Sequence, residues 1–247
     1  MKRPSRFRLW VQILFTALTN GYALGFSKGS IYQGASKQVC VPGLNCYSCP
    51  GAIASCPIGS LQAVIGSPNH LISFYLIGFL MIVGALIGRV ACGWLCPFGL
   101  VQDLLHKLPS KKLRRLPLDR QLRWVKYGVL VVFVIALPLF LTGVAGIGTP
   151  WFCKLICPSG TLMAGLPLVA SNPVLQQAIG LLFYWKVGLL VAILVLAVVL
   201  YRPFCKYLCP LGAIYGLFNR FSLYRYEIDP HTCTHCGHCH TVCDMDV

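Results

Sequence analysis

The residues of this sequence that are most able to do chemistry are its 14 cysteines. Three strings share the pattern Cys-x3-Cys-Pro-x-Gly, and they begin at Cys92, Cys153 and Cys205. A looser fourth copy ends in the same way at Cys56, with other cysteines shortly before it. Two cysteines four residues apart project from one face of a helical turn. Two such strings placed together would supply four thiolates, which is a complete ligand set for an iron–sulfur cluster.

The proline in each string predicts the local structure around the second cysteine. Proline lacks an N–H and has a fixed φ, so it ends the incoming helix and favours the start of a new one. The second cysteine then lies at a helix start, where free amides and the positive end of the helix dipole favour an anionic thiolate. Burial for packing alone is the alternative role for such cysteines, and the repetition of the string argues against it.

Composition assigns the chain to the membrane proteins. It is 57% hydrophobic and only 11% charged, which is beyond what a soluble core requires. The net charge of +15 indicates topology and not a nucleic-acid partner, because Lys and Arg collect at the cytoplasmic face of a membrane protein. Only four basic residues fall in the segments that we assign to the outer face: Lys28, Lys37, Lys154 and Lys186.

Four apolar stretches predict four transmembrane helices, at residues 9–26, 70–90, 124–144 and 181–201. The basic start resembles a signal peptide, but no clean cleavage site follows, so we expect a retained helix with its N-terminus inside. Residues 161–180 are apolar but broken by prolines, which favours an interfacial or re-entrant segment. We expect an all-α, multi-pass protein of a bacterial or archaeal cytoplasmic membrane, with both termini cytoplasmic.

The order of helices and cysteine strings predicts a duplicated two-helix unit with cysteine loops at both membrane faces. A parallel repeat about an axis along the membrane normal pairs inner loop with inner loop and outer loop with outer loop. The expected inner cluster ligands are Cys92, Cys96, Cys205 and Cys209. The outer candidates exceed the number that one cluster needs: Cys46, Cys49, Cys56, Cys153 and Cys157, with Cys40 as a further candidate. The bases that could offset cluster charge are Arg89, Lys154, Arg202 and Lys206.

Disulfides are the alternative for the cysteines of the outer loop. Thiols stay reduced in the cytoplasm but oxidise outside it. This alternative therefore concerns Cys40, Cys46, Cys49 and Cys56.

Residues 1–222 form the expected transmembrane domain, and a cytoplasmic segment, residues 223–247, carries the strongest local motif. Its cysteines follow the bacterial ferredoxin spacing Cys-x2-Cys-x2-Cys-x3-Cys for a [4Fe–4S] cluster. They are Cys233, Cys236, Cys239 and Cys243. Zinc is the competing interpretation, because four histidines are interleaved with them. No haem is expected, since the other histidines, His70 and His106, lie at or beyond helix ends.

With these strings assembled, the chain resembles the NapH-type membrane ferredoxins, the C-terminal membrane part of NosR and the CcoG-type polyferredoxins. The resemblance rests on residues 92–99, 205–212 and 233–243. It implies four membrane helices, cytoplasmic [4Fe–4S] clusters, and electron transfer linked to quinol oxidation and a periplasmic reductase. The chain departs from the simplest pattern in its outer cysteines and in carrying one ferredoxin motif where two are common.

We therefore expect an electron-transfer subunit that relays electrons between the two membrane faces through three [4Fe–4S] clusters. Its expected partners are lipid, other subunits of a membrane redox complex and a redox donor or acceptor, and a quinone is a candidate cofactor. A quinol dehydrogenase subunit that feeds a periplasmic reductase is the enzymatic alternative. A zinc-binding assembly factor is the alternative without redox chemistry. The sequence has no pairing of nucleophile and base, so any net reaction is expected to belong to partner subunits.

Overall fold

A computed structural model describes residues 6–67, 73–113, 118–141 and 148–225, together with residues 233–234 and 236–237. These residues are mostly helical and contain no strand, apart from an isolated bridge between Cys40 and Ser55. The first helices are α1 (Arg6–Thr19), α2 (Leu24–Lys28), the 3₁₀ turn η1 (Ala35–Gln38), α3 (Pro57–Ile65), α4 (Phe74–Leu86), α5 (Val90–Trp94) and α6 (Pro97–His106). The next are α7 (Asp119–Val129), the π-helical η2 (Leu130–Ala136), α8 (Leu137–Phe140), α9 (Trp151–Leu155), α10 (Pro158–Gly160) and the π-helical η3 (Thr161–Gly165). The last are α11 (Leu166–Ser171), α12 (Pro173–Gln177), α13 (Leu181–Val199), α14 (Pro203–Tyr207) and α15 (Pro210–Phe218).

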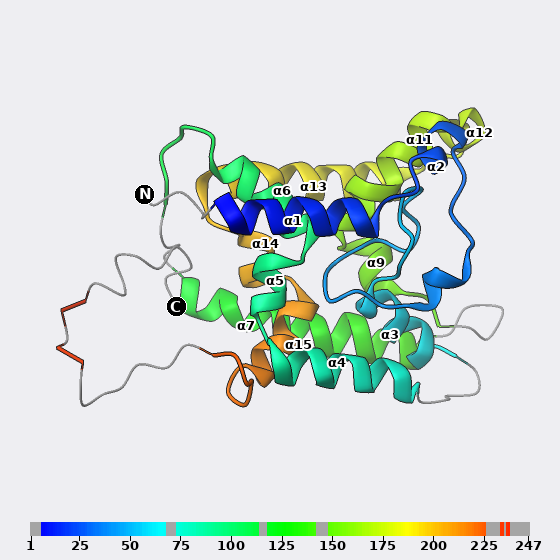
Figure 1. Ribbon diagram of the computed structural model, residues 1–247. Helices are drawn as coiled ribbons and strands as arrows, with labels where there is room; N and C mark the ends of the chain where they lie inside the picture. Colours follow the sequence, from blue (N-terminus) through cyan, green and yellow to red (C-terminus); the bar gives the residue numbers. More distant parts are fainter. Residues whose placement is uncertain are drawn as a thin grey trace.

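The longer helices lie in two layers. Figure 1 shows α1 and α13 along one side of the molecule and α4 and α7 along the other, with the short helices α5, α9 and α14 between the layers. The helix that begins with α7 continues through η2 and α8. Followed along the chain, the four segments alternate in direction (Figure 1). The short helices that contain cysteines therefore lie in the interior, between the long helices.

Within the described residues, two helices are long and apolar enough to cross a membrane. They are Asp119–Phe140, with 22 residues, and Leu181–Val199, with 19. The first and second predicted spans are shorter than expected, because α1 has 14 residues and α4 has 13. A helix needs roughly 20 residues to cross the hydrocarbon core. Residues 161–180 form the broken helices η3, α11 and α12, as their prolines predict.

Local chemistry explains the early ends of α1 and α4. At the end of α1, Thr19 Oγ1 donates to the Phe15 carbonyl at 2.9 Å, and Asn20 Nδ2 donates to the Thr16 carbonyl at 3.1 Å. Such side-chain bonds compete with continuation of the helical ladder. Beyond α4, Gly88 has a φ of +48°, a left-handed conformation that glycine adopts without strain and that ends the helix.

A buried ion pair joins α6 to the start of α14. Arg202 is 4% exposed, and its Nε and Nη2 donate to the two carboxylate oxygens of Asp103 at 2.7 and 2.5 Å. Its Nη1 donates to the Cys92 carbonyl at 2.8 Å, and Arg8 of α1 donates to Asp103 at 2.9 Å. Burial alone would lower the pKa of Arg202, but its hydrogen bonds to Asp103 raise it, so the guanidinium stays charged. Its φ of +47° is a strained conformation that these contacts hold in place.

We expect Asp103→Ala to lower the free energy of unfolding by about 3–5 kcal/mol, because it leaves the Arg202 charge buried without a partner. Thermal or urea unfolding in detergent measures the loss. The matched control is the double variant Asp103→Ala/Arg202→Met, which removes both charges and should recover most of the stability. A single variant that is no less stable than the double variant would contradict the assigned role of the pair.

Candidate metal centres

Each of the four Cys-Pro strings forms the helix start that its proline predicts. The second cysteine is the N-cap of the following helix, with the proline in its first turn, in α3, α6, α10 and α15. All four N-caps have extended backbones, from φ −64° and ψ 107° at Cys157 to φ −86° and ψ 117° at Cys96. The prediction of a thiol at a helix N-terminus is confirmed in all four copies.

The glycine of the Cys-Pro-x-Gly pattern points its amide at the sulfur. The Gly160 N–H donates to Cys157 Sγ and the Gly212 N–H donates to Cys209 Sγ, each at 3.4 Å. In both cases the thiol caps its own helix. Hydrogen bonds of this kind stabilise negative charge on the sulfur.

The inner cysteines line a single cavity. Cys92, Cys96, Cys205 and Cys209 all contribute to a cavity of about 570 Å³ between α5, α7, α14 and α15. Its lining includes six cationic side chains: Arg8, Arg89, Arg123, Lys126, Arg202 and Lys206. The structure therefore brings together the four cysteines that the repeat predicts for the inner site.

Positive charge exceeds negative charge around this cavity. Asp103 engages Arg8 and Arg202. Asp119 engages Arg123 through Oδ2 at 2.5 Å and Lys206 through Oδ1 at 2.7 Å. In the part of the chain that the structure describes, two carboxylates thus face six cations, and the surplus favours an anionic ligand.

Lys126 belongs to this surplus. It is 6% exposed and lies in the helix Asp119–Phe140. None of the ion pairs found in the described part of the chain involves it. A buried charge is normally paired or bound to an opposite charge. Lys126 therefore fits beside an anionic group in the cavity.

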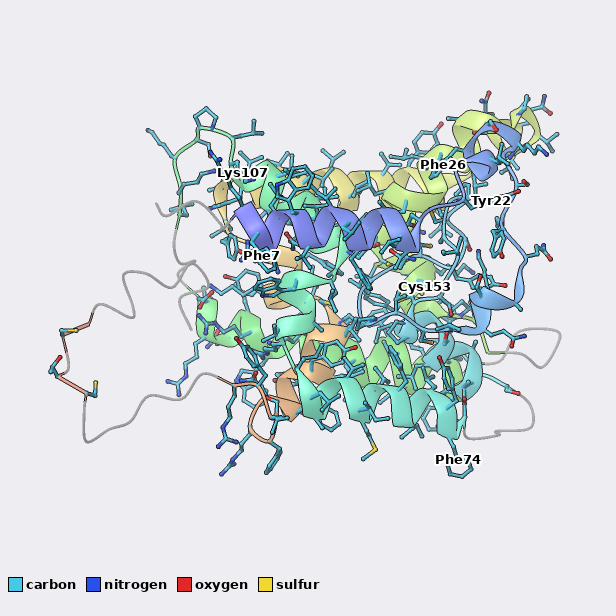
Figure 2. The ribbon with its side chains drawn as sticks, in the orientation of Figure 1. Phe7, Tyr22, Phe26, Phe74, Lys107 and Cys153 are labelled. Atoms are coloured by element: carbon cyan, nitrogen blue, oxygen red, sulfur yellow. The ribbon has the colours of Figure 1, made fainter. Side chains whose placement is uncertain are left out.

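The outer cysteines gather around α9 and α10. Cys46 Sγ and Cys157 Sγ both lie beside Gly160, at 3.6 and 3.8 Å from the position that a Cβ would occupy there. Burial raises the pKa of Cys153 well above its usual value, and the charges of Cys157, Cys56 and Cys46 raise it further. Figure 2 shows Cys153 in the interior, between the layer of α1 and the layer of α4. The outer grouping is therefore Cys46, Cys56, Cys153 and Cys157.

Of the two further outer candidates, Cys49 lies next to the grouping, since its N–H donates to the Cys46 carbonyl at 3.0 Å, and Cys40 has other surroundings. Cys40 is buried, and its Sγ lies 3.7 Å from Ser60 Oγ and 3.9 Å from Ser55 Oγ. Burial raises the pKa of Cys49. Hydrogen bonds from the backbone N–H groups of Gly51 and Ala52, and the charge of Lys37, offset part of this rise. The alternative of disulfides finds no support, because all the cysteines of the described segments are free thiols.

Two glutamines link the strings of each pair in the same way. Gln62 Nε2 donates to Cys153 Sγ at 3.3 Å, and its Oε1 accepts from the Phe152 N–H at 3.0 Å. Gln102 repeats both contacts at the inner site, to Cys205 Sγ at 3.3 Å and from the Phe204 N–H at 3.2 Å. Both glutamines are 0% exposed. Each glutamine lies on the helix that follows a cysteine string of the first half of the chain. Each binds the facing string of the second half.

The donor set fits an iron–sulfur cluster. Burial, as the largest cause, raises the pKa of Cys46, Cys56 and Cys205 to about 12. Cysteine binds metal as the thiolate, so these thiols need a strongly positive ligand. No three His, Cys, Asp or Glu side chains of the described segments approach closely enough to hold a single ion. A four-iron cluster, whose irons each bind one thiolate, suits more widely spaced cysteines.

Some predicted ligands and bases are placed differently or not described. Cys239 and Cys243 lie outside the described residues, as does most of the ferredoxin-like motif. Lys154 is exposed, and its Nζ stacks over the Trp151 ring at 5.4 Å. Lys186 is the base of the outer grouping instead, with its Nζ donating to the Cys153 carbonyl at 3.2 Å.

These sites define a ferredoxin-type iron–sulfur protein. The chain matches the model of the family described as a 4Fe-4S binding domain over residues 69–115, 129–169 and 181–225, which is more than half of its length. The chain belongs to this family, among the ferredoxin-type membrane proteins of the NapH kind. No solved structure matches it.

Curated relatives support the assignment. The ferredoxin-type protein MauN of methylamine utilization from Paracoccus denitrificans is 34% identical over 181 residues, covering 70% of this chain and 53% of the relative. The ferredoxin-type protein NapH of Haemophilus influenzae is 30% identical over 182 residues, covering 68% and 53%. An uncharacterized protein of Methanocaldococcus jannaschii is 30% identical over 174 residues, covering 68% and 56%. The chain thus spans about half the length of these relatives.

Sequence reasoning missed the glutamines, although a signal was present. Each follows the second cysteine of its string by six residues, so the full pattern in the first half is Cys-Pro-x-Gly-x-x-Gln at Cys56 and at Cys96. The same offset after Cys209 gives Tyr215. Lys126 had no sequence signal beyond a basic residue at the edge of an apolar stretch.

We expect Gln102→Leu to lower the free energy of unfolding by about 1–3 kcal/mol, because it leaves the buried Phe204 N–H without an acceptor. Thermal unfolding in detergent measures the change. Gln121→Leu, on an exposed position of α7, is the matched control and should have little effect. Equal stability of the two variants would show that the glutamine bridge does not hold the inner strings together.

Proposed function

We propose that this protein is a membrane electron-transfer subunit that relays electrons between the two membrane faces through [4Fe–4S] clusters. The inner grouping of Cys92, Cys96, Cys205 and Cys209 would hold one cluster, the outer grouping a second, and the ferredoxin-like motif a third. The observation that carries the proposal is the inner cavity, where four cysteines from two strings in different halves of the chain meet a surplus of positive charge. Membership of the 4Fe-4S binding domain family supports the same cofactor.

The chain's own residues supply what such a relay requires. A bound [4Fe–4S] cluster accepts and releases one electron at a time. The Gly160, Gly212 and glutamine N–H groups donate to the cysteine sulfurs and so stabilise negative charge there. The long helices lie on either side of the cysteine strings (Figure 1). The cationic lining of the inner cavity favours addition of an electron.

We further propose that all four predicted helices cross or line the membrane interior, with the ends near α6 on the cytoplasmic face. Four alternating segments surround the cysteine strings (Figure 1). Non-helical backbone is tolerated at membrane depth only where protein buries it, and the strings between the two layers meet this condition. The repeated glutamine contacts support a duplicated unit, with each string of the first half bound to its counterpart in the second.

A quinol dehydrogenase subunit is the second candidate. Three aromatic side chains, Trp124, Tyr127 and Tyr201, line the inner cavity together with the cysteines. Cavities that bind flat organic molecules are lined in this way, and the volume is within their range. Reduction of the clusters of the isolated protein by a quinol analogue would favour this function, and reduction only by a protein donor would favour the relay.

We expect anaerobically purified protein to contain about 12 iron atoms per chain, the sum of three four-iron clusters. The variant Cys205→Ser/Cys209→Ser should contain about four fewer. Cys40→Ser, which alters a buried thiol outside both groupings, is the matched control and should keep the full content. Iron, acid-labile sulfide and zinc analysis provides the measurement. Zinc with little iron would end the electron-transfer proposal.

We expect Lys126→Met to lower the midpoint potential of the inner cluster, because it removes a buried positive charge that stabilises the reduced state. A shift of tens of millivolts is the scale, since a tenfold change in a one-electron equilibrium is about 59 mV. A redox titration followed by electron paramagnetic resonance measures it. Lys107→Met, at the exposed end of α6, is the control. If both variants had the same midpoint potential, Lys126 would not act on the inner cluster.

A further inference from the structure

The outer loop reaches the inner cysteine grouping. At Gly43, a Cβ would lie 3.0 Å from the Cys96 Cα, so only glycine allows this approach without a shift. The next residue, Leu44, is 2% exposed and lines the inner cavity. The chain segment that leads into the outer grouping thus forms part of the wall of the inner one.

The same segment is fixed to the outer grouping. Ser159, two residues after Cys157, donates from Oγ to the Leu44 carbonyl at 3.2 Å. Two residues further along the chain from Leu44 is Cys46, whose sulfur lies beside Gly160. One short stretch of backbone therefore contacts both groupings.

Tyr215 lies on the helix that Cys209 of the inner grouping caps. It is 0% exposed, and its hydroxyl is buried without a hydrogen-bond partner. It lies on α15, which packs against α3, the helix capped by Cys56. The helix that carries Tyr215 is therefore capped by a cysteine of the inner grouping and contacts a helix capped by a cysteine of the outer one.

An unpartnered buried hydroxyl is unusual in a native protein and points to an unseen acceptor. Thiolates of Cys209 and Cys56, at the starts of α15 and of the helix that it contacts, are acceptors of the required kind. A protonated phenol can only donate to such sulfurs, which stabilises their negative charge. A buried hydroxyl on this helix therefore suits an interaction with thiolates of the two groupings.

We propose that the inner and outer groupings hold an adjacent pair of clusters that exchange electrons directly, with Tyr215 packed between them. This inference rests on the proposed function. Each transfer moves one electron, so that one site is oxidised as the other is reduced, and no proton is required. Electrons would then cross the roughly 30 Å of hydrocarbon core through a close pair of sites in the interior. No quinone would be needed between the two sites.

The first test is electron paramagnetic resonance of the fully reduced full-length protein. The wild type should show spin–spin broadening that disappears in Cys153→Ser/Cys157→Ser and in Cys92→Ser/Cys96→Ser. Metal analysis of the same samples shows whether each variant has lost one cluster only. A wild-type spectrum equal to the sum of the isolated signals would overturn the adjacent pair and leave the relay standing. Absence of clusters from the wild type would overturn the proposed function itself.

The second test is Tyr215→Phe, which keeps the ring and removes the hydroxyl. We expect the midpoint potentials of both clusters to fall, each by an amount equivalent to about a tenfold change in the equilibrium constant, with iron content unchanged. An electron–nuclear double resonance signal from an exchangeable proton should disappear as well. Tyr184→Phe, on an exposed position of α13, is the control. A shift in one potential only, or in neither, would show that Tyr215 does not lie between the clusters.

Discussion

Burial of sulfur beside sulfur is the constraint on which the rest of the described structure depends. Away from water, thiolates are unfavourable unless positive charge or N–H groups face them. The rise in the pKa of Cys46, Cys56 and Cys205 to about 12 expresses that cost. The surrounding structure offsets it with helix N-termini, glycine amides, glutamine amides and cationic side chains. Under the proposed function, a bound iron–sulfur cluster would supply the remaining positive charge at the thiols themselves.

This constraint also explains the architecture. A buried backbone needs its polar groups paired, yet the turns that present cysteines interrupt helical pairing. The glutamines resolve part of this conflict, because one amide accepts from the backbone of a facing string and donates to its sulfur. Arg202 has a similar role at the end of α13, where it binds the Cys92 carbonyl and the Asp103 carboxylate. The interior is thus a polar network that helices shield, and its members come from both halves of the chain.

Local chemistry made much of this predictable from the sequence. Proline after cysteine determines a helix start, so the N-cap thiols follow from the strings alone, and repetition of the strings indicated which loops would meet. Helix length was harder to predict from the sequence, because two helices end inside their apolar stretches. The side chains of Thr19 and Asn20 end the first, and the conformation of Gly88 ends the second. The separation of Cys40 from the outer grouping depends on contacts with Ser55 and Ser60 that no spacing encodes. Long-range packing determines such positions, and a single sequence does not reveal it.

The two groupings differ in charge, and this difference has a consequence for the proposed relay. Six cations line the inner cavity, whereas the bases that act on the outer cysteines are Lys186 at Cys46 and Cys157 and Lys37 at Cys49. Adding an electron makes a site more negative, and nearby positive charge favours that step more strongly in a buried site than in water. In the proposed adjacent pair, this difference in charge would make the inner site the better electron acceptor. Electrons that enter at the outer grouping would move toward the inner one, and flow in the opposite direction would need a donor strong enough to overcome that preference.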